Sequence, residues 1–249
     1  MKVCAVIPVY NHAEAIGDVV RGLRAHGLPV CLVDDGSEPG CAAVLRDLAE
    51  QDAQVMLHVR PRNGGKGSAV IDGVRTVAAA GYTHALQIDA DGQHDTRDVP
   101  NFLAAAAAAP DAIVNGNPIY DESVPRARLY GRYLTHVWVW INTLSLRITD
   151  SMCGFRVYPL APMLPLLDRV RIGKRMDFDT EILVRLDWAG VPIRNLPTRV
   201  RYPQDGVSHF RPLMDNVHIS AMHTRLFFGM LLRAPRLLLR HVLPQRRAR

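Results

Sequence analysis

Acidic residues are absent from the last part of this sequence. None follows Asp215, whereas seven arginines do, in a chain whose formal net charge is +6. The positive charge is therefore concentrated at the C-terminal end, which predicts an anionic partner there, either a membrane surface or a nucleic acid. No nucleic-acid recognition motif and no interleaving of aromatic with basic residues accompanies it, which favours the membrane.

Cysteines and long apolar runs are also scarce. The chain has 4 cysteines and no CxxC pair, so no zinc site is expected, and Cys4 and Cys31 lie in apolar runs typical of buried, reduced thiols. The most apolar stretches, residues 134–148 and 226–232, are interrupted or bounded by polar residues, so no bilayer-spanning helix is expected. The sequence enters an apolar run directly after Met1, which predicts no signal peptide and a cytoplasmic protein.

The first half of the chain alternates short apolar runs with helical patterns. Such alternation predicts an α/β fold in which helices cover a sheet of parallel strands. Strands are expected at residues 3–8, 30–33, 55–59, 85–88 and 112–114, and helices at residues 13–26, 42–51, 66–80 and 98–109.

The second half is less regular. Its patterns predict helices at residues 126–148 and 179–189, strands at residues 155–158 and 191–200, and one or two basic helices at residues 214–243, broken near Pro235. The last segment is typical of a helix that lies on a membrane surface, although a helix packed on the domain is the alternative. It interleaves arginines with Leu226, Phe227, Met230, Leu231, Leu237 and Leu238.

Two aspartates, Asp89 and Asp91, follow the strand expected at residues 85–88. Residues two apart in a strand point to the same side, so both carboxylates can converge where the strand ends. Like charges at one point need a cation or a shared proton, and a hard divalent ion that holds a diphosphate fits this requirement. Gln93 can add a neutral oxygen ligand, whereas His94 suits a structural role or a substrate contact. An acidic turn without a metal is the alternative.

Further polar clusters follow other strands of the expected sheet. Tyr10-Asn11 and Asp34-Asp35 come after the first two strands, and ligands of such sheets bind at the carboxyl ends of strands. The aspartates can accept hydrogen bonds from a nucleobase or ribose, or can simply form a turn. The glycine-rich segment 60–68 contains Lys66 and precedes a helix, so it is either an anion-binding loop or a flexible turn.

The second half contains two more candidate segments. Asp177, Asp179 and Glu181 stand at the start of an expected helix, and Asp179 is the first candidate for a general base that deprotonates an acceptor hydroxyl. Helix capping is the alternative for these acids. A late polar segment with His209 can close over a diphosphate, or it is a solvated loop.

Taken in order, these motifs resemble those of family 2 glycosyltransferases of the GT-A fold, especially the polyprenyl-phosphate (dolichyl-phosphate) sugar synthases. The resemblance runs from Val3 to about His209. It rests on residues 6–11 (VIPVYN), 33–37 (VDDGS), 63–69 (NGGKGSA), 89–94 (DADGQH), 150–156 (DSMCGFR) and 178–181 (FDTE).

The resemblance implies a Rossmann-like mixed sheet flanked by helices, and inverting transfer of a sugar from a UDP- or GDP-sugar. Together with the motifs above, it assigns Asp89, Asp91 and Gln93 to a Mg²⁺ or Mn²⁺ ion. Asp179 and Asp91 are the predicted catalytic residues. The predicted donor-binding residues are Pro8, Tyr10, Asn11, Asp34, Asp35, Lys66, Asp89 and His209.

One departure from that family branch concerns the acceptor. The branch usually has a Ser-Arg pair after the next strand, and its Arg holds the acceptor phosphate, whereas this sequence has Asn115-Gly116-Asn117-Pro118. Acceptor binding is therefore assigned to Arg128, Arg132 and Arg156, and a different lipid-like or hydroxylated acceptor stays open.

These interpretations divide the chain into a GT-A domain at residues 1–212 and a basic amphipathic, membrane-associating tail at residues 213–249. Within the domain, residues 1–115 are the nucleotide-sugar half and residues 116–212 the acceptor half. The predicted activity is metal-dependent sugar transfer to a membrane-proximal, lipid-linked acceptor at the inner face of a membrane. A sugar-phosphate nucleotidyltransferase and a non-catalytic nucleotide- or lipid-binding module are the alternatives.

Overall fold

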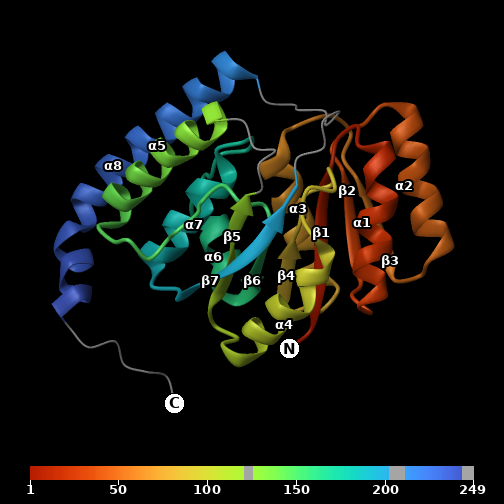
Figure 1. The fold of residues 1–249 in the computed structure, drawn as a ribbon, viewed down its shortest axis with the longest axis horizontal. Coiled ribbons are helices and arrows are strands. Elements are labelled where there is room, and N and C mark those ends of the chain that lie inside the picture. The colour runs from red at the N-terminus through yellow and green to blue at the C-terminus, as the bar shows by residue number, and fades with distance from the viewer. Residues whose placement is uncertain (121–125, 202–210, 243–249) are drawn as a thin grey trace.

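The computed structural model describes residues 1–120, 126–201 and 211–242. They form a seven-stranded sheet with helices on both faces (Figure 1). The strands are β1 (Val3–Val9), β2 (Val30–Asp34), β3 (Val55–Val59), β4 (His84–Gln87), β5 (Ile113–Tyr120), β6 (Arg156–Pro159) and β7 (Ile193–Val200). The helices are α1 (Ala13–Ala25), α2 (Pro39–Gln51), α3 (Lys66–Ala79), the 3₁₀ turn η1 (Thr96–Asp98), α4 (Val99–Ala108), α5 (Arg126–Thr143), α6 (Leu160–Arg169), α7 (Phe178–Ala189) and α8 (Pro212–Val242).

The sheet has the strand order β3-β2-β1-β4-β6-β5-β7 and is mixed. Strands β1 to β4 pair in parallel, as their alternation with helices predicted. Strand β6 runs antiparallel to both β4 and β5, and β7 returns to the parallel direction beside β5. The GT-A-like mixed sheet expected from the resemblance is therefore confirmed.

Successive residues of the central strands face opposite sides of the sheet, because side chains alternate along a strand. On β1, Cys4 and Val6 pack among residues of α3, α6 and α7, whereas Ala5 and Ile7 pack against α1, α2 and α4. All four cysteines are buried and unpaired, and burial raises the pKa of Cys4 to about 12.

Helix α8 is a 31-residue helix that continues through Pro235, where a break was expected. Figure 1 shows it running alongside α5 on the outer side of α7. Met222, Leu226 and Met230 are buried in the core of the domain, so one face of α8 is part of the domain's packing. In the described residues, no helix is both long and apolar enough to cross a membrane.

Candidate active site

The carboxyl ends of β1, β2 and β4 lie at one edge of the sheet. The register pairs Val9 with Asp34, and the backbone of Ile88 donates to the carbonyl of Val6. The segments that follow these strands, which carry Tyr10-Asn11, Asp34-Asp35 and Asp89–His94, therefore begin at the same edge. In a parallel sheet this edge is where ligands bind.

The centre of this edge is an ion-paired cluster of Lys66, Asp89 and Asp179. The Lys66 Nζ lies 2.7 Å from Asp89 Oδ1 and 2.7 Å from Asp179 Oδ2, so a single ammonium bridges the two carboxylates. Gln87 Nε2 donates to Asp179 Oδ1 at 2.8 Å. Residues from α3, β4, α7 and the segment after β4 thus meet at one point.

The charges in this cluster shift each other's proton affinity. Burial alone would lower the pKa of Lys66, but Asp179 and Asp89 raise it above its ordinary value. Burial opposes ionisation of Asp89 too, yet Lys66 and His94 hold the pKa of Asp89 well below its usual range. Lys66 is therefore the counter-ion of both carboxylates in the ligand-free protein.

Glycines at the start of α3 bring this helix close to α7. The backbone N–H groups of Gly64 and Gly65 donate to the carboxylate of Asp35 at 2.9 and 2.8 Å, which fixes the loop before Lys66. A Cβ on Gly67 would lie 2.5 Å from the Cβ of Phe178, so only glycine allows this approach. Lys66 can reach Asp179 because of this close packing.

Asp91 lies with Asp89 in the segment that follows β4, and the two aspartates are called the acidic strand end below. Its Oδ1 accepts from the backbone N–H of Gln93 at 3.0 Å, and burial together with the charge of Asp89 raises the pKa of Asp91. A carboxylate that is hard to ionise beside a second carboxylate is a site that a cation stabilises. Oxygen ligands of this kind suit Mg²⁺ or Mn²⁺, which complete their coordination with substrate phosphates. The carboxylates of Asp89 and Asp91 therefore fit the predicted ion, with Gln93 next to them in the chain, although in the described residues no three His, Cys, Asp or Glu side chains gather as a preformed metal cluster.

The loop between α5 and β6 packs against the carboxylate of Asp89 in this cluster. A Cβ on Gly154 would lie 2.2 Å from Asp89 Oδ2, so glycine is required beside the carboxylate. Arg156, which the sequence assigned to acceptor binding, is fully buried. It donates to the backbone carbonyls of Ser151 at 2.6 Å and Asp179 at 2.5 Å. Arg156 therefore ties the loop to α7 and positions Asp179, and it presents no surface to an acceptor.

The predicted donor-binding residues at the ends of β1 and β2 line one side of the site, and most of them are hydrogen-bonded to neighbouring loops. Asp34 accepts from the backbone N–H of Ser37 at 2.8 Å, and Asn11, at a positive φ of 58°, accepts from that of Glu38 at 2.8 Å. Pro8 is buried within β1, whereas Tyr10 is partly exposed at its end. Asp35 is occupied by the glycine loop and by Arg60. Asp34 thus holds its own loop, and Asp35 holds the glycine loop before α3.

A polar cavity of about 380 Å³ lies on the acceptor half. Arg132 donates to both oxygens of Asp150, through Nε at 2.5 Å and Nη2 at 2.8 Å, and His136 Nε2 lies 3.2 Å from Asp150 Oδ2. Burial opposes the charge of Asp150, but His136 and Arg132 hold its pKa well below the usual range. The cavity is lined by Asn117, Pro118, Tyr120, Tyr130, Arg132, Tyr133, His136 and Asp150.

One loop links this cavity to the acidic cluster. Asp150 lines the cavity, and Gly154, four residues on, touches Asp89. Of the predicted acceptor residues, Arg132 lies in the cavity, whereas the side chain of Arg128 and all of His209 fall outside the described residues. The sequence reasoning missed His136, although its spacing of four from Arg132 on an expected helix places both on one face.

This mixed seven-stranded sheet flanked by helices has the architecture of a GT-A fold. Solved structures agree: the glucosyl-3-phosphoglycerate synthase from Mycobacterium tuberculosis, in complex with Mn²⁺ and UDP-glucose, superposes with a TM-score of 0.64 at 15% identity, covering 93% of this chain and 78% of that chain. The model of the family described as glycosyl transferase family 2 matches residues 4–162. The chain belongs to glycosyl transferase family 2.

Two similar proteins of known sequence have names that state their acceptors. An undecaprenyl-phosphate mannosyltransferase of Micrococcus luteus is 29% identical over 164 residues, which is 64% of this chain and 66% of that protein. A UDP-N-acetylglucosamine--dolichyl-phosphate N-acetylglucosaminyltransferase of Methanococcus voltae is 26% identical over 215 residues, covering 78% of this chain and 85% of that protein.

Proposed function

We propose that this protein transfers a sugar, with inversion, from a UDP- or GDP-sugar to a lipid-linked phosphate at a membrane surface, with the help of a divalent metal ion. The observation that carries the proposal is the Lys66–Asp89–Asp179 cluster at the strand ends, joined by one loop to a polar cavity with an arginine and a histidine. A donor site and an acceptor site within one loop's reach suit a direct displacement between two bound substrates.

The donor's diphosphate belongs at the acidic strand end. Asp89 and Asp91, with Gln93, would hold the ion, which when bound supplies positive charge to the departing nucleoside diphosphate. Lys66 brings a further positive charge to the same place. The mycobacterial neighbour, which shares the fold at 15% identity, is itself solved with Mn²⁺ and UDP-glucose.

The acceptor's phosphate belongs in the polar cavity. Arg132 already donates to Asp150 through Nε and Nη2, so an acceptor phosphate would share this guanidinium with the carboxylate, and His136 beside it adds a second donor group. The names of the two relatives, which act on undecaprenyl and dolichyl phosphates, favour this acceptor class. An acceptor that enters as a doubly charged phosphate has no proton to lose, whereas a hydroxyl acceptor needs a base such as Asp179.

A transfer assay separates this function from its rivals. The protein is mixed with Mn²⁺, a nucleotide sugar and a polyprenyl phosphate in detergent, and the released nucleotide is identified. We expect nucleoside diphosphate and a sugar-lipid phosphate in equal amounts. Pyrophosphate formed from a nucleoside triphosphate and a sugar phosphate would indicate a nucleotidyltransferase instead, and binding of the nucleotide sugar without any turnover would indicate a non-catalytic module.

Substitution of Asp179 tests its role as the base. With a hydroxyl acceptor we expect Asp179→Asn to lower kcat by about 10²-fold, within the range for general bases, whereas with the proposed phosphate acceptor, which has no proton to lose, kcat should stay near that of the wild type. The Kd of the donor should change little in either case. The Asn side chain can still accept from Gln87, so the local hydrogen bonds are kept. Calorimetric donor binding and steady-state rates check this expectation. A near-normal rate would show that the acceptor needs no base.

Membrane association would use the outer face of α8. This face is apolar and exposed, opposite to the face that packs on the domain, whereas Arg225, Arg233 and Arg240 contact the domain. Its exposed residues are Leu213, Met214, Val217, Phe228, Leu231, Leu232, Leu238 and Leu239. We infer a peripheral protein on the inner face of the membrane.

Paired substitutions on this face test the membrane contact. We expect Phe228→Asp with Leu232→Asp to weaken binding to anionic liposomes by at least about tenfold, because apolar burial is lost and negative charge is added. Both side chains are exposed, so the fold should persist, whereas deletion of α8 would uncover the core. Val59→Asp, on an exposed apolar residue of β3, is the matched control. Equal sedimentation of both variants with liposomes would contradict the contact.

A further inference from the structure

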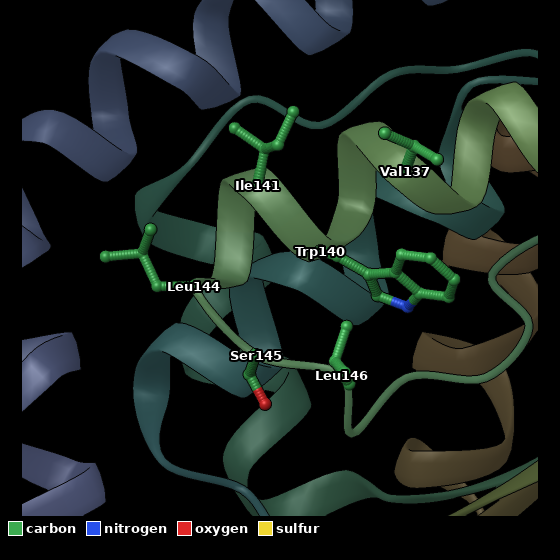
Figure 2. A pocket seen from close by; sticks show the side chains of 6 residues that line it. All are labelled: Val137, Trp140, Ile141, Leu144, Ser145 and Leu146. Atoms are coloured by element: carbon green, nitrogen blue, oxygen red, sulfur yellow. The ribbon is translucent and has the colours of Figure 1, made fainter.

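An apolar cavity of about 450 Å³ lies at the C-terminal end of α5, beyond the polar cavity. Figure 2 shows its side chains grouped around the last turn of the helix and the segment that follows. Five of the six are apolar: the cavity is lined by Val137, Trp140, Ile141, Leu144, Ser145 and Leu146. Of these, Leu146 is 71% exposed, so large apolar surface is left uncovered here.

The two cavities share one helix and touch through an aromatic pair. Tyr133 lines the polar cavity, Trp140 lines the apolar one, and their rings meet edge to face with centroids 6.2 Å apart. The Trp140 indole is fixed by donation to the carbonyl of Ile148 at 2.9 Å. From His136 to Leu144 the helix axis advances about 12 Å, at about 1.5 Å per residue. The pocket that holds the Arg132–Asp150 ion pair thus continues into an apolar one over a short distance.

The helix end at this cavity is strained. Leu144 has a φ of 49°, and in the described residues only Asn11 among the other non-glycine residues has a positive φ. The backbone N–H of Leu144 donates to Ile141 and that of Ser145 to Trp140, which is the helix ending in which glycine usually occupies the position of Leu144. A leucine in the left-handed region costs conformational energy, and such strain concentrates at functional sites. Here it keeps a large apolar side chain on the cavity wall.

From these observations we propose that the apolar cavity is a hydrocarbon subsite, which receives the first isoprenoid units of an acceptor whose phosphate lies in the adjoining polar cavity. The subsite rests on the proposed lipid-phosphate acceptor and adds a selection for chain length to it. Leu144 and Leu146 are its specificity-determining residues, and the chain would leave past Leu146 toward the exposed side of α5. An amphiphile with a compact anionic head followed directly by an apolar chain matches the order of the two cavities.

The test compares two soluble acceptors with the same head group, so that no membrane is involved. Calorimetry measures the Kd of farnesyl phosphate, with three isoprenoid units, and of isopentenyl phosphate, with one. Since each buried methylene is worth about fourfold in affinity, we expect the wild-type protein to prefer farnesyl phosphate by at least about 100-fold. Leu144→Gly removes the wall while relieving the left-handed backbone, and Leu146→Asp places a charge at the mouth; each should reduce this preference at least about tenfold and leave isopentenyl phosphate binding unchanged.

Leu134→Asp is the control on the same helix, since Leu134 is exposed and does not line the cavity; its preference should equal that of the wild type. An unchanged preference in both cavity variants, or no preference in the wild type, would overturn the subsite. If the wild type prefers farnesyl phosphate in binding but the transfer assay gives no product, the proposed function is overturned and the subsite is kept.

Discussion

Asp91→Asn is expected to lower the kcat of sugar transfer by about 10³-fold, because several kcal/mol of charge stabilisation at the leaving diphosphate depend on the ion that Asp91 helps to hold. The Asn side chain keeps an oxygen that can accept from the backbone N–H of Gln93. Burial and Asp89 raise the pKa of Asp91, so its ionised form is unfavourable in the free protein. The variant should therefore melt no lower than the wild type in the absence of ligands, while Mn²⁺-dependent binding of a nucleoside diphosphate is lost.

Thermal scans and calorimetry with and without Mn²⁺ separate these two effects. Asp111→Asn, the same change at an exposed acid away from the strand ends, should leave both the melting temperature and the Mn²⁺-dependent binding as they are. Turnover within a factor of three of the wild type in Asp91→Asn would remove Asp91 from the metal site. Lost turnover with intact Mn²⁺-dependent binding would assign it to a later step.

The strands and helices of the nucleotide half were predictable because they repeat one local pattern. Each buried strand followed by an amphipathic helix gives a parallel neighbour, and polar clusters at the strand ends then share an edge. The direction of β6 was not predictable in the same way: a buried strand of only four residues carries no sign of its orientation. Helix α6 was missed because Pro165 lies inside it, yet Leu160, Met163 and Leu167 bury one face and hold the helix against the sheet.

The contacts within the site were less predictable than its residues. The sequence placed Asp89, Lys66 and Asp179 in three separate motifs, and only the packing of Gly67 on Phe178 brings the lysine to both acids. Arg156 was read as an acceptor contact because its charge suits a phosphate, but a charged side chain can also be buried where backbone carbonyls accept its donors. Such long-range contacts depend on how elements pack, which local patterns do not encode.

Lys66→Met is expected to lower the stability of the ligand-free protein by about 3–5 kcal/mol, because it leaves Asp89 and Asp179 close together without their shared counter-ion. For a chain of this size the melting temperature should fall by about 10 °C. Mn²⁺ should restore part of this loss, since a divalent ion held by Asp89 and Asp91 can supply part of the missing positive charge. We therefore expect Mn²⁺ alone to raise the melting temperature of the variant more than that of the wild type, in which Lys66 competes for Asp89.

The comparison also orders the binding events. If Lys66 and the ion compete for Asp89 in the free protein, a diphosphate that attracts Lys66 should tighten Mn²⁺ binding in the wild type and have a much smaller effect in Lys66→Met. Mn²⁺ titrations with and without nucleoside diphosphate measure this coupling, and Lys2→Met, at an exposed lysine, is the control. Equal Mn²⁺ effects on wild type and variant would show that the ammonium and the metal ion occupy independent places, and that Lys66 serves only to hold α3 against α7.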